Sequence, residues 1–247
     1  MFDIAEKIAI SNLAFNYYID NVQSEKDKII VKTHLGILDD GQIIEGEYNY
    51  TKNSIKYRIR ELCINELPID GLYKMVTMVE GIFVIVINKL LQEYPEKIGS
   101  KIKIDATIIL ESQSLDELKN YLFKRVINDL TYKSPEDFAK DFKDISGVDL
   151  LKCESYSYYI ELKATRDLFM HNDGIINEIY LRKVKDFKRG DDGEKIVCDY
   201  DYFLNCYEHC HKVVEFLIEE LNLIWKSSDY IDWKNGIVNK VKNENNK

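Results

Sequence analysis

The fold class of this chain is decided by residues 72–94, LYKMVTMVEGIFVIVINKLLQEY. The apolar residues of this stretch recur at three- and four-residue steps, which is the period of one helix face: Leu72, Met75, Val76, Val79, Phe83, Val86, Ile87, Leu90 and Tyr94. Pro95 and Gly99 end the run. Glu80 stands at the edge of the stripe, where it either faces solvent or points into a site between helices. The stretch predicts a long core helix and a mainly α fold.

The sequence before this helix predicts a small α/β extension of unknown role over residues 1–70. Residues 2–20 carry apolar residues at a helical spacing. Residues 28–51 are rich in β-branched and aromatic residues around Asp40-Gly41, a pair that suits a tight hairpin turn. Pro68-Ile69-Asp70-Gly71 then predicts a boundary near residue 70.

The sequence after residue 95 predicts further helices, with Ser114 and Ser134 as N-caps of two of them. We expect these helices over 114–130, 134–147, 149–171 and 200–225. Residues 101–110 alternate like a strand but are also compatible with a helix. The chain therefore divides into the extension, a helical domain over 71–226 and a polar tail over 227–247.

Composition excludes several classes of protein. The net charge of -9 argues against a protein that coats nucleic acid by bulk electrostatics. Five scattered cysteines without a CxxC pair indicate thiols in a reducing cytoplasm. The first residues do not form a signal peptide, and the longest apolar run, 82–87, is too short to cross a bilayer, so we expect a cytoplasmic protein without membrane contact.

We expect no metal and no cofactor. The chain has no Gly-rich phosphate loop, no nucleophile elbow and no HExxH motif. Cys206, His209 and Cys210 can share a helix face, but no second ligand pair stands at a finger-like spacing. These cysteines also fit the apolar stripe of the last helix, and packing is the favoured interpretation.

Arg166-Asp-Leu-Phe-Met-His171-Asn-Asp-Gly174 brings a cation and an imidazole into one short helical segment. Gly174 can take the left-handed conformation that closes a helix. Arg166 and His171 lie about 140° apart around an ideal helix and about 7.5 Å apart along it. A second copy across a two-fold axis would bring two of each together more easily. The alternative interpretation is a surface ion pair of Arg166 or His171 with Asp167 or Asp173.

The wider string TRDLFMHNDGIINEIYLRK, residues 165–183, resembles the HEPN superfamily, whose members are helical domains found in many prokaryotic toxins and antiviral systems. The ribonuclease members carry an Arg, four to six residues and then a His, which Arg166 and His171 match. The resemblance extends more loosely over about 72–226 and does not cover residues 1–70. It implies an up-and-down helical bundle.

The resemblance also implies a metal-independent endoribonuclease that works as a homodimer, with one composite cleft between two motif helices. Arg166 would hold the scissile phosphate. His171 would act as general base or acid and leave a 2′,3′-cyclic phosphate. Asp167 or Asn172 would orient these groups, and Glu80 would support them. A Tyr that often stands two places after the His is Asp173 here, so silencing by adenylylation at that position is not supported.

One basic run follows the motif. Its cations are Arg182, Lys183, Lys185, Lys188 and Arg189, and it also contains Phe187. Such a run is either a solvated loop or an RNA-backbone contact with an aromatic ring available for stacking. The expected partners are therefore an RNA substrate, a second copy and a toxin–antitoxin or defence-system partner, with no DNA. Two alternatives stay open: a non-catalytic dimerisation or partner-binding module, and a domain that binds a nucleotide or another small molecule.

Overall fold

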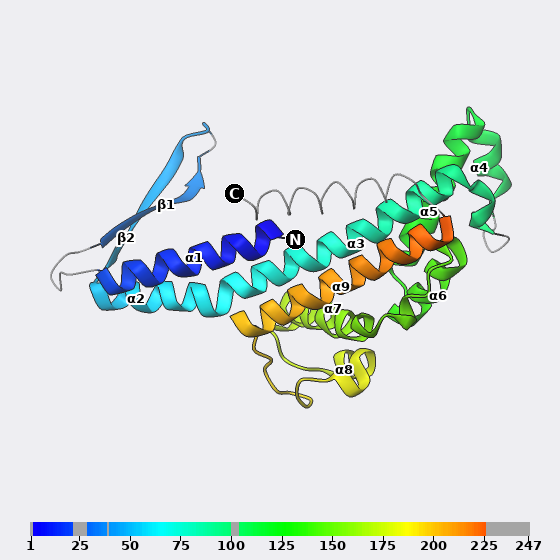
Figure 1. The fold of residues 1–247 in the computed structure, drawn as a ribbon. Coiled ribbons are helices and arrows are strands. Elements are labelled where there is room, and N and C mark those ends of the chain that lie inside the picture. The colour runs from blue at the N-terminus through cyan, green and yellow to red at the C-terminus, as the bar shows by residue number, and fades with distance from the viewer. Residues whose placement is uncertain (1, 22–28, 39, 100–103, 226–247) are drawn as a thin grey trace, which may run out of the picture. The chain divides into compact units, whose positions relative to one another are not determined.

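The computed structural model describes residues 2–21, 29–38, 40–99 and 104–225. This part of the chain is mainly helical, with a two-stranded antiparallel sheet near the N-terminus (Figure 1). The helices are α1 (Phe2–Asn21), α2 (Lys52–Glu61), α3 (Leu67–Glu93), α4 (Ala106–Glu111), α5 (Leu115–Thr131), α6 (Pro135–Ser146), α7 (Glu154–Asn172), α8 (Glu178–Val184) and α9 (Tyr200–Trp225). The strands are β1 (Ile29–Ile37) and β2 (Ile43–Tyr50).

Contacts between residues divide the chain into two units. The smaller unit holds Met1–Met75 and Val197–Asn205, and the larger unit holds Val76–Ile196 and Cys206–Lys247. Both α3 and α9 therefore contribute residues to both units.

The predicted hairpin is confirmed in the smaller unit. Strands β1 and β2 pair antiparallel, with Ile29 opposite Tyr50. Gly41 has φ +83°, the left-handed conformation that a tight hairpin turn at Asp40-Gly41 requires. The Leu38 N–H donates to the Gln42 carbonyl at 2.8 Å and closes the loop.

Pro68–Gly71 does not interrupt the helix, because α3 runs from Leu67 to Glu93. The smaller unit nevertheless ends close by, at Met75. α2 and α3 form one helical run, Lys52–Glu93, joined by a π-helical turn at Leu62–Glu66. Pro68 has no N–H, and its ring would crowd the carbonyl four residues back. The wider π-turn, in which the Leu67 N–H donates to the Leu62 carbonyl, lies directly before Pro68 and accommodates this demand without ending the helix.

By length and composition this helical run could cross a membrane. The residues that line one side of α3 are nevertheless packed inside the protein, as in a core helix: Leu72, Met75, Val76, Val79, Phe83, Ile87 and Leu91 are at most 2% exposed. The cytoplasmic location stays a prediction.

The larger unit packs α3, α6 and α7 around Phe83. The Phe83 ring lies 5.3 Å from the ring centroid of Phe142 and 6.0 Å from that of Tyr159. α9 lies alongside α3 in Figure 1, and the rings of Trp225 and Tyr94 pack against each other at a tilt, with centroids 4.6 Å apart. These aromatic contacts give the unit a rigid interior that positions α7.

Three details answer expectations from the sequence. Ala106–Glu111 is helical, which decides the structure of the described part of 101–110. α7 begins at Glu154, later than expected, after a 3₁₀ turn at Leu150–Lys152. Cys206 and Cys210 are buried thiols on α9, as packing residues would be. The polar tail over 227–247 lies outside the described residues.

Candidate functional site

Arg166 and His171 lie in the C-terminal part of α7, and the turn after the helix fixes that end. Asp173 and Gly174 both have positive φ, +50° and +75°. The Gly174 N–H donates to the Leu168 carbonyl at 3.1 Å, which closes the helix. The Asn172 side-chain amide donates to the Ile175 carbonyl at 2.6 Å. Asn172 therefore holds the turn after the helix, and its amide nitrogen is not directed at Arg166 or His171.

Arg166 lies in an acidic setting and is only 15% exposed. Its Nη2 donates to Glu80 Oε1 at 3.3 Å, and its Nε lies 2.9 Å from Asp167 Oδ1. Glu80 Oε1 also binds Lys163 Nζ at 2.6 Å. Glu80 thus points toward the motif helix, which is the second of the two interpretations of its place at the stripe edge.

Arg166 and His171 line one groove of about 450 Å³. Its wall also contains Glu80, Thr131, Tyr132, Lys133, Ser134, Pro135, Ile160, Lys163, Ala164, Asp167 and Lys183. His171 is exposed, whereas Arg166 lies deeper. Both residues line this groove although they lie about 140° apart around an ideal helix.

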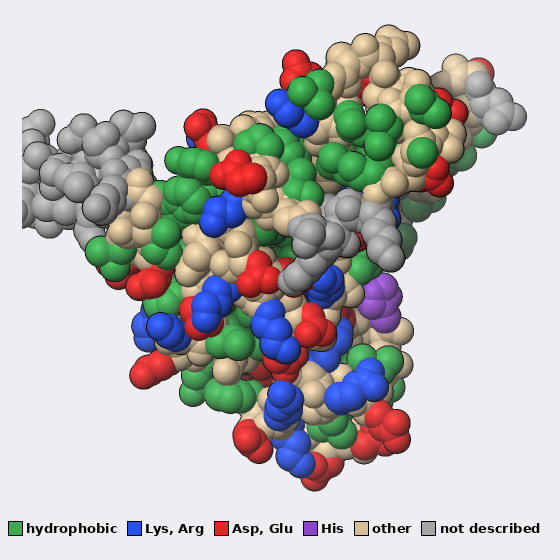
Figure 2. All heavy atoms as spheres, turned by 90° about the vertical axis from the view of Figure 1, so that its right-hand side faces the viewer, with side chains coloured by type: hydrophobic (Ala, Val, Ile, Leu, Met, Phe, Trp, Pro, Cys, Tyr) green, Lys and Arg blue, Asp and Glu red, His purple; other side chains and the backbone are tan. Residues whose placement is uncertain are grey.

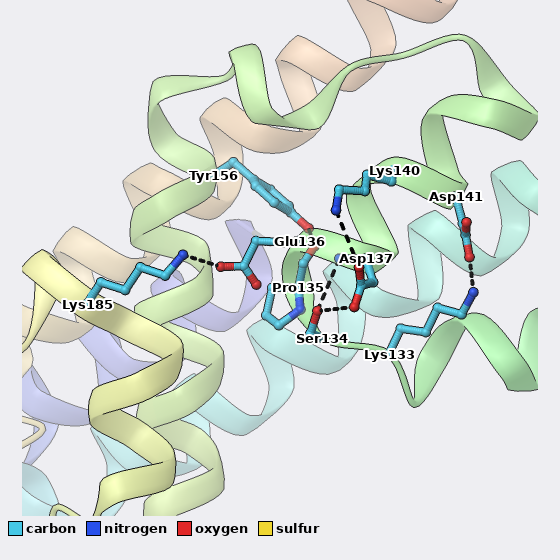
Figure 3. Close-up of polar contacts among 9 residues, drawn as sticks. All are labelled: Lys133, Ser134, Pro135, Glu136, Asp137, Lys140, Asp141, Tyr156 and Lys185. Carbon is cyan, nitrogen blue, oxygen red and sulfur yellow. Dashed lines mark hydrogen bonds and ion pairs between the residues drawn. The ribbon is translucent and has the colours of Figure 1, made fainter.

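The turn between α5 and α6 forms one side of this groove and is held from several elements (Figure 3). The Tyr156 hydroxyl, on α7, donates to the Pro135 carbonyl at 3.1 Å. Lys185 Nζ pairs with Glu136 Oε1 at 2.8 Å, and Lys133 pairs with Asp141. The turn is therefore a fixed wall, tied to both α7 and the segment after α8.

The groove is cationic although the protein is acidic. Lys133, Lys163, Arg166 and Lys183 line it, against Glu80 and Asp167. Such an excess of positive charge in a concave site favours an anionic ligand. Lys163 and Lys133 were missed from the sequence. The signal for Lys163 was its position three residues before Arg166, which puts the two on one helix face.

The basic run after the motif is only partly in the site. Lys183 Nζ lies 3.0 Å from Asp167 Oδ2 and lines the groove. Lys185 and Lys188 pair with Glu136 and Asp191, and neither they nor Arg182 and Arg189 line the groove. On the face drawn in Figure 2, Lys and Arg side chains alternate with Asp and Glu. The run does not form one cationic patch.

One expectation about the run, that it is a loop, is corrected by the structure. Arg182 and Lys183 belong to α8, and Lys185–Phe187 form a 3₁₀ turn, so the first half is not a loop. Helix formation follows from Asn177, whose side chain accepts from the Tyr180 N–H at 3.0 Å as an N-cap. The Phe187 ring packs edge-on against Tyr158, with centroids 4.9 Å apart, so it is already engaged in a contact within the protein.

Comparison with known proteins finds no relative of this chain. No protein-family model, no curated protein and no solved structure matches the chain. Among the described residues, no group of three or more His, Cys, Asp or Glu side chains is arranged to hold a metal ion. The chemistry that the groove supports therefore follows from its own residues.

Proposed function

We propose that this chain is a metal-independent endoribonuclease of the HEPN type, acting in a toxin–antitoxin or antiviral setting. The observation that carries the proposal is the convergence of Arg166 and His171 on one cationic groove. The chemistry that suits this groove is attack of a ribose 2′-hydroxyl on the adjacent phosphate, because that reaction needs a proton acceptor, a proton donor and a cation, and no metal.

In this proposal, Arg166 and Lys163 bind the oxygens of the scissile phosphate and stabilise the charge that grows on them. His171 takes the proton of the 2′-hydroxyl as the 2′-oxygen bonds to phosphorus. The 5′-oxygen leaves with a proton from an imidazolium, and the products are a 2′,3′-cyclic phosphate and a 5′-hydroxyl. Asp167 holds Arg166 and Lys183 in place through its two carboxylate oxygens.

The test is incubation of the full chain with total RNA and tRNA in EDTA, with end-group analysis of the products. We expect the wild type to leave cyclic phosphate ends. His171→Ala and Arg166→Ala should each lose about 100-fold or more in rate, the usual scale for removing a general base or a phosphate-binding cation. Cys63→Ala serves as the matched control away from the groove. Equal RNA integrity with wild type and His171→Ala would refute the proposal.

A second copy of the chain completes the proposed site, because one imidazole cannot give and take a proton in the same step. We propose a homodimer in which the grooves of two copies face each other. Excess His171→Ala protein mixed with wild type should then lower the cleavage by the wild type, since a mixed dimer retains only one of the two imidazoles. If the wild type cleaves at an unchanged rate in such a mixture, the composite site is wrong and each groove acts by itself.

A second candidate is a non-catalytic dimerisation or partner-binding module. It is favoured by the apolar side chains that the hairpin leaves exposed, among them Val31, Leu35, Ile44 and Tyr48. Under this candidate, Arg166→Ala and His171→Ala leave cellular function intact, whereas Val31→Asp with Tyr48→Asp abolishes it. The opposite pattern of phenotypes favours the nuclease.

A further inference from the structure

We infer that one face of α2, in the smaller unit, is a binding site for single-stranded RNA. This inference rests on the proposed function, because it takes RNA as the substrate, and it gives residues 1–70 a role. The face is defined by Lys52, Asn53, Lys56, Tyr57 and Arg60. At 100° per residue these positions fill an arc of about 140° on the helix, and no acidic or apolar aliphatic residue interrupts it.

The fold fixes this face toward the outside of the helix. Ile55 and Ile59 are the buried residues of α2, and they lie on a different arc of the helix. Tyr57 is 68% exposed. A capping box at Thr51 and Ser54 begins the helix, and the π-turn continues it into α3. The cations therefore stand on a rigid element and not on a loop.

Within the described part of the chain, the cations of this face have no ion-pair partner, unlike three cations of the basic run over 182–189. Within the described ranges, no ion pair of Lys52, Lys56 or Arg60 is present, whereas Arg58, outside the arc, pairs with Glu66 at 2.7 Å. By contrast, Lys183, Lys185 and Lys188 each bind a carboxylate of the protein. A cation that has no carboxylate to give up binds a phosphate at lower cost.

The arrangement suits a single strand in particular. Asn53, Lys56, Tyr57 and Arg60 line a hollow of about 330 Å³. Lys56 and Arg60 are one helical turn apart, so they can contact separate phosphates. Tyr57 presents a ring on which a base can stack, which requires an unpaired base. Cations that follow the backbone, together with an aromatic side chain among them, are the features by which proteins hold single strands without reading their sequence.

The test is fluorescence anisotropy of the full chain with a labelled, fully 2′-O-methylated oligoribonucleotide, which 2′-hydroxyl chemistry cannot cleave. Lys56→Ala with Arg60→Ala should weaken binding about tenfold or more and reduce the slope of log K against log salt by about 1.4, the value for two lost phosphate contacts on a single strand. The matched control is Arg58→Ala with Lys89→Ala, which removes the same charge outside this face. Wild-type affinity and slope are expected for the control.

Tyr57 supplies an independent variant. Tyr57→Ala should bind about fivefold more weakly or worse, and Tyr57→Phe should bind as the wild type does, because the stacking face is kept. The inference is overturned if Lys56→Ala with Arg60→Ala matches its control pair in affinity and slope, or if Tyr57→Ala matches Tyr57→Phe. Since the probe cannot be cleaved, this result is separate from the His171-dependent cleavage that decides the proposed function.

Discussion

Glu80 is the carboxylate that neutralises part of the positive charge of the groove. One of its oxygens contacts both Lys163 and Arg166, at 2.6 and 3.3 Å, and the side chain is 32% exposed. The carboxylate thus lies where an incoming phosphate oxygen would bind the same two cations. A ligand must compete with it, so Glu80 both positions the cations and weakens anion binding.

We predict that Glu80→Gln tightens binding of the uncleavable RNA by about fivefold, since removal of one partly exposed charge from an ion pair is worth about 1 kcal/mol. The Gln side chain keeps the shape and one oxygen acceptor. Glu93→Gln, an exposed carboxylate further along α3, makes the same change of net charge away from the groove and should have little effect. Weaker binding by Glu80→Gln than by Glu93→Gln would show that orientation of Arg166 outweighs the competition.

The turn that ends α7 is the element that holds His171, and it depends on Gly174. The residue has φ +75°, and an added Cβ would meet the Phe169 ring at 2.8 Å. Gly193 has a similar φ, +82°, but a Cβ there would meet nothing within 4 Å. We predict that Gly193→Ala costs about 1–2 kcal/mol from backbone strain alone, and Gly174→Ala about 1–3 kcal/mol more from overpacking.

Urea unfolding of both glycine variants measures this difference. In Gly174→Ala, movement of the helix end should also reduce RNA cleavage, whereas Gly193→Ala should cleave as the wild type does. An equal loss of stability in the two variants would mean that the Phe169 ring moves aside freely, and that the turn after α7 is held by the hydrogen bonds of its backbone.

Elements with a local signal were the ones that the sequence could predict. Asp40-Gly41 marked the hairpin, and Ser114 and Ser134 marked helix starts, because turn and cap chemistry involve neighbours in the chain. Pro68 wrongly predicted an interruption of the helix, since the π-turn that accommodates it has no sequence signature. The helical content was therefore predictable, while the continuity of α2 and α3 was not.

The candidate site also combines residues that a local pattern indicates with residues that only the fold brings together. Arg166 and His171 were predicted because both lie in one short stretch of the sequence. Their partners are distant in sequence: Glu80 is 86 positions from Arg166, and Glu136 is 49 positions from Lys185. Only the fold shows that Lys185 and Lys188 pair with carboxylates. It also shows that Lys52, Lys56 and Arg60 have no ion pair with a described residue. Charge composition alone does not show this difference between the two basic segments.

At the scale of the whole molecule, the core of the larger unit holds several ionisable groups away from water. Burial raises the pKa of the Cys210 thiol to about 12, and it also raises the pKa values of Tyr156, Tyr159 and Tyr180 above the ordinary value for tyrosine. In each case the folded protein keeps a proton that the unfolded chain releases. Their contribution to stability is full below the unfolded pKa and is lost as the pH rises toward the folded pKa.

We therefore predict that the free energy of unfolding falls from about pH 9 upward, by about 1.4 kcal/mol per pH unit for each group whose proton the unfolded chain has lost. Cys210 acts first, and the three tyrosines add to the slope above about pH 10. Urea midpoints between neutral pH and about pH 12 measure the slope, because a total stability of about 5–15 kcal/mol is exhausted within that range. Cys210→Ala should flatten the first part of the curve by about one proton, whatever it does to the stability at neutral pH. A stability that stays level above pH 10 would show that these side chains reach water in the folded protein, and the packing of α3, α6 and α7 around Phe83 would then be looser than the structure has it.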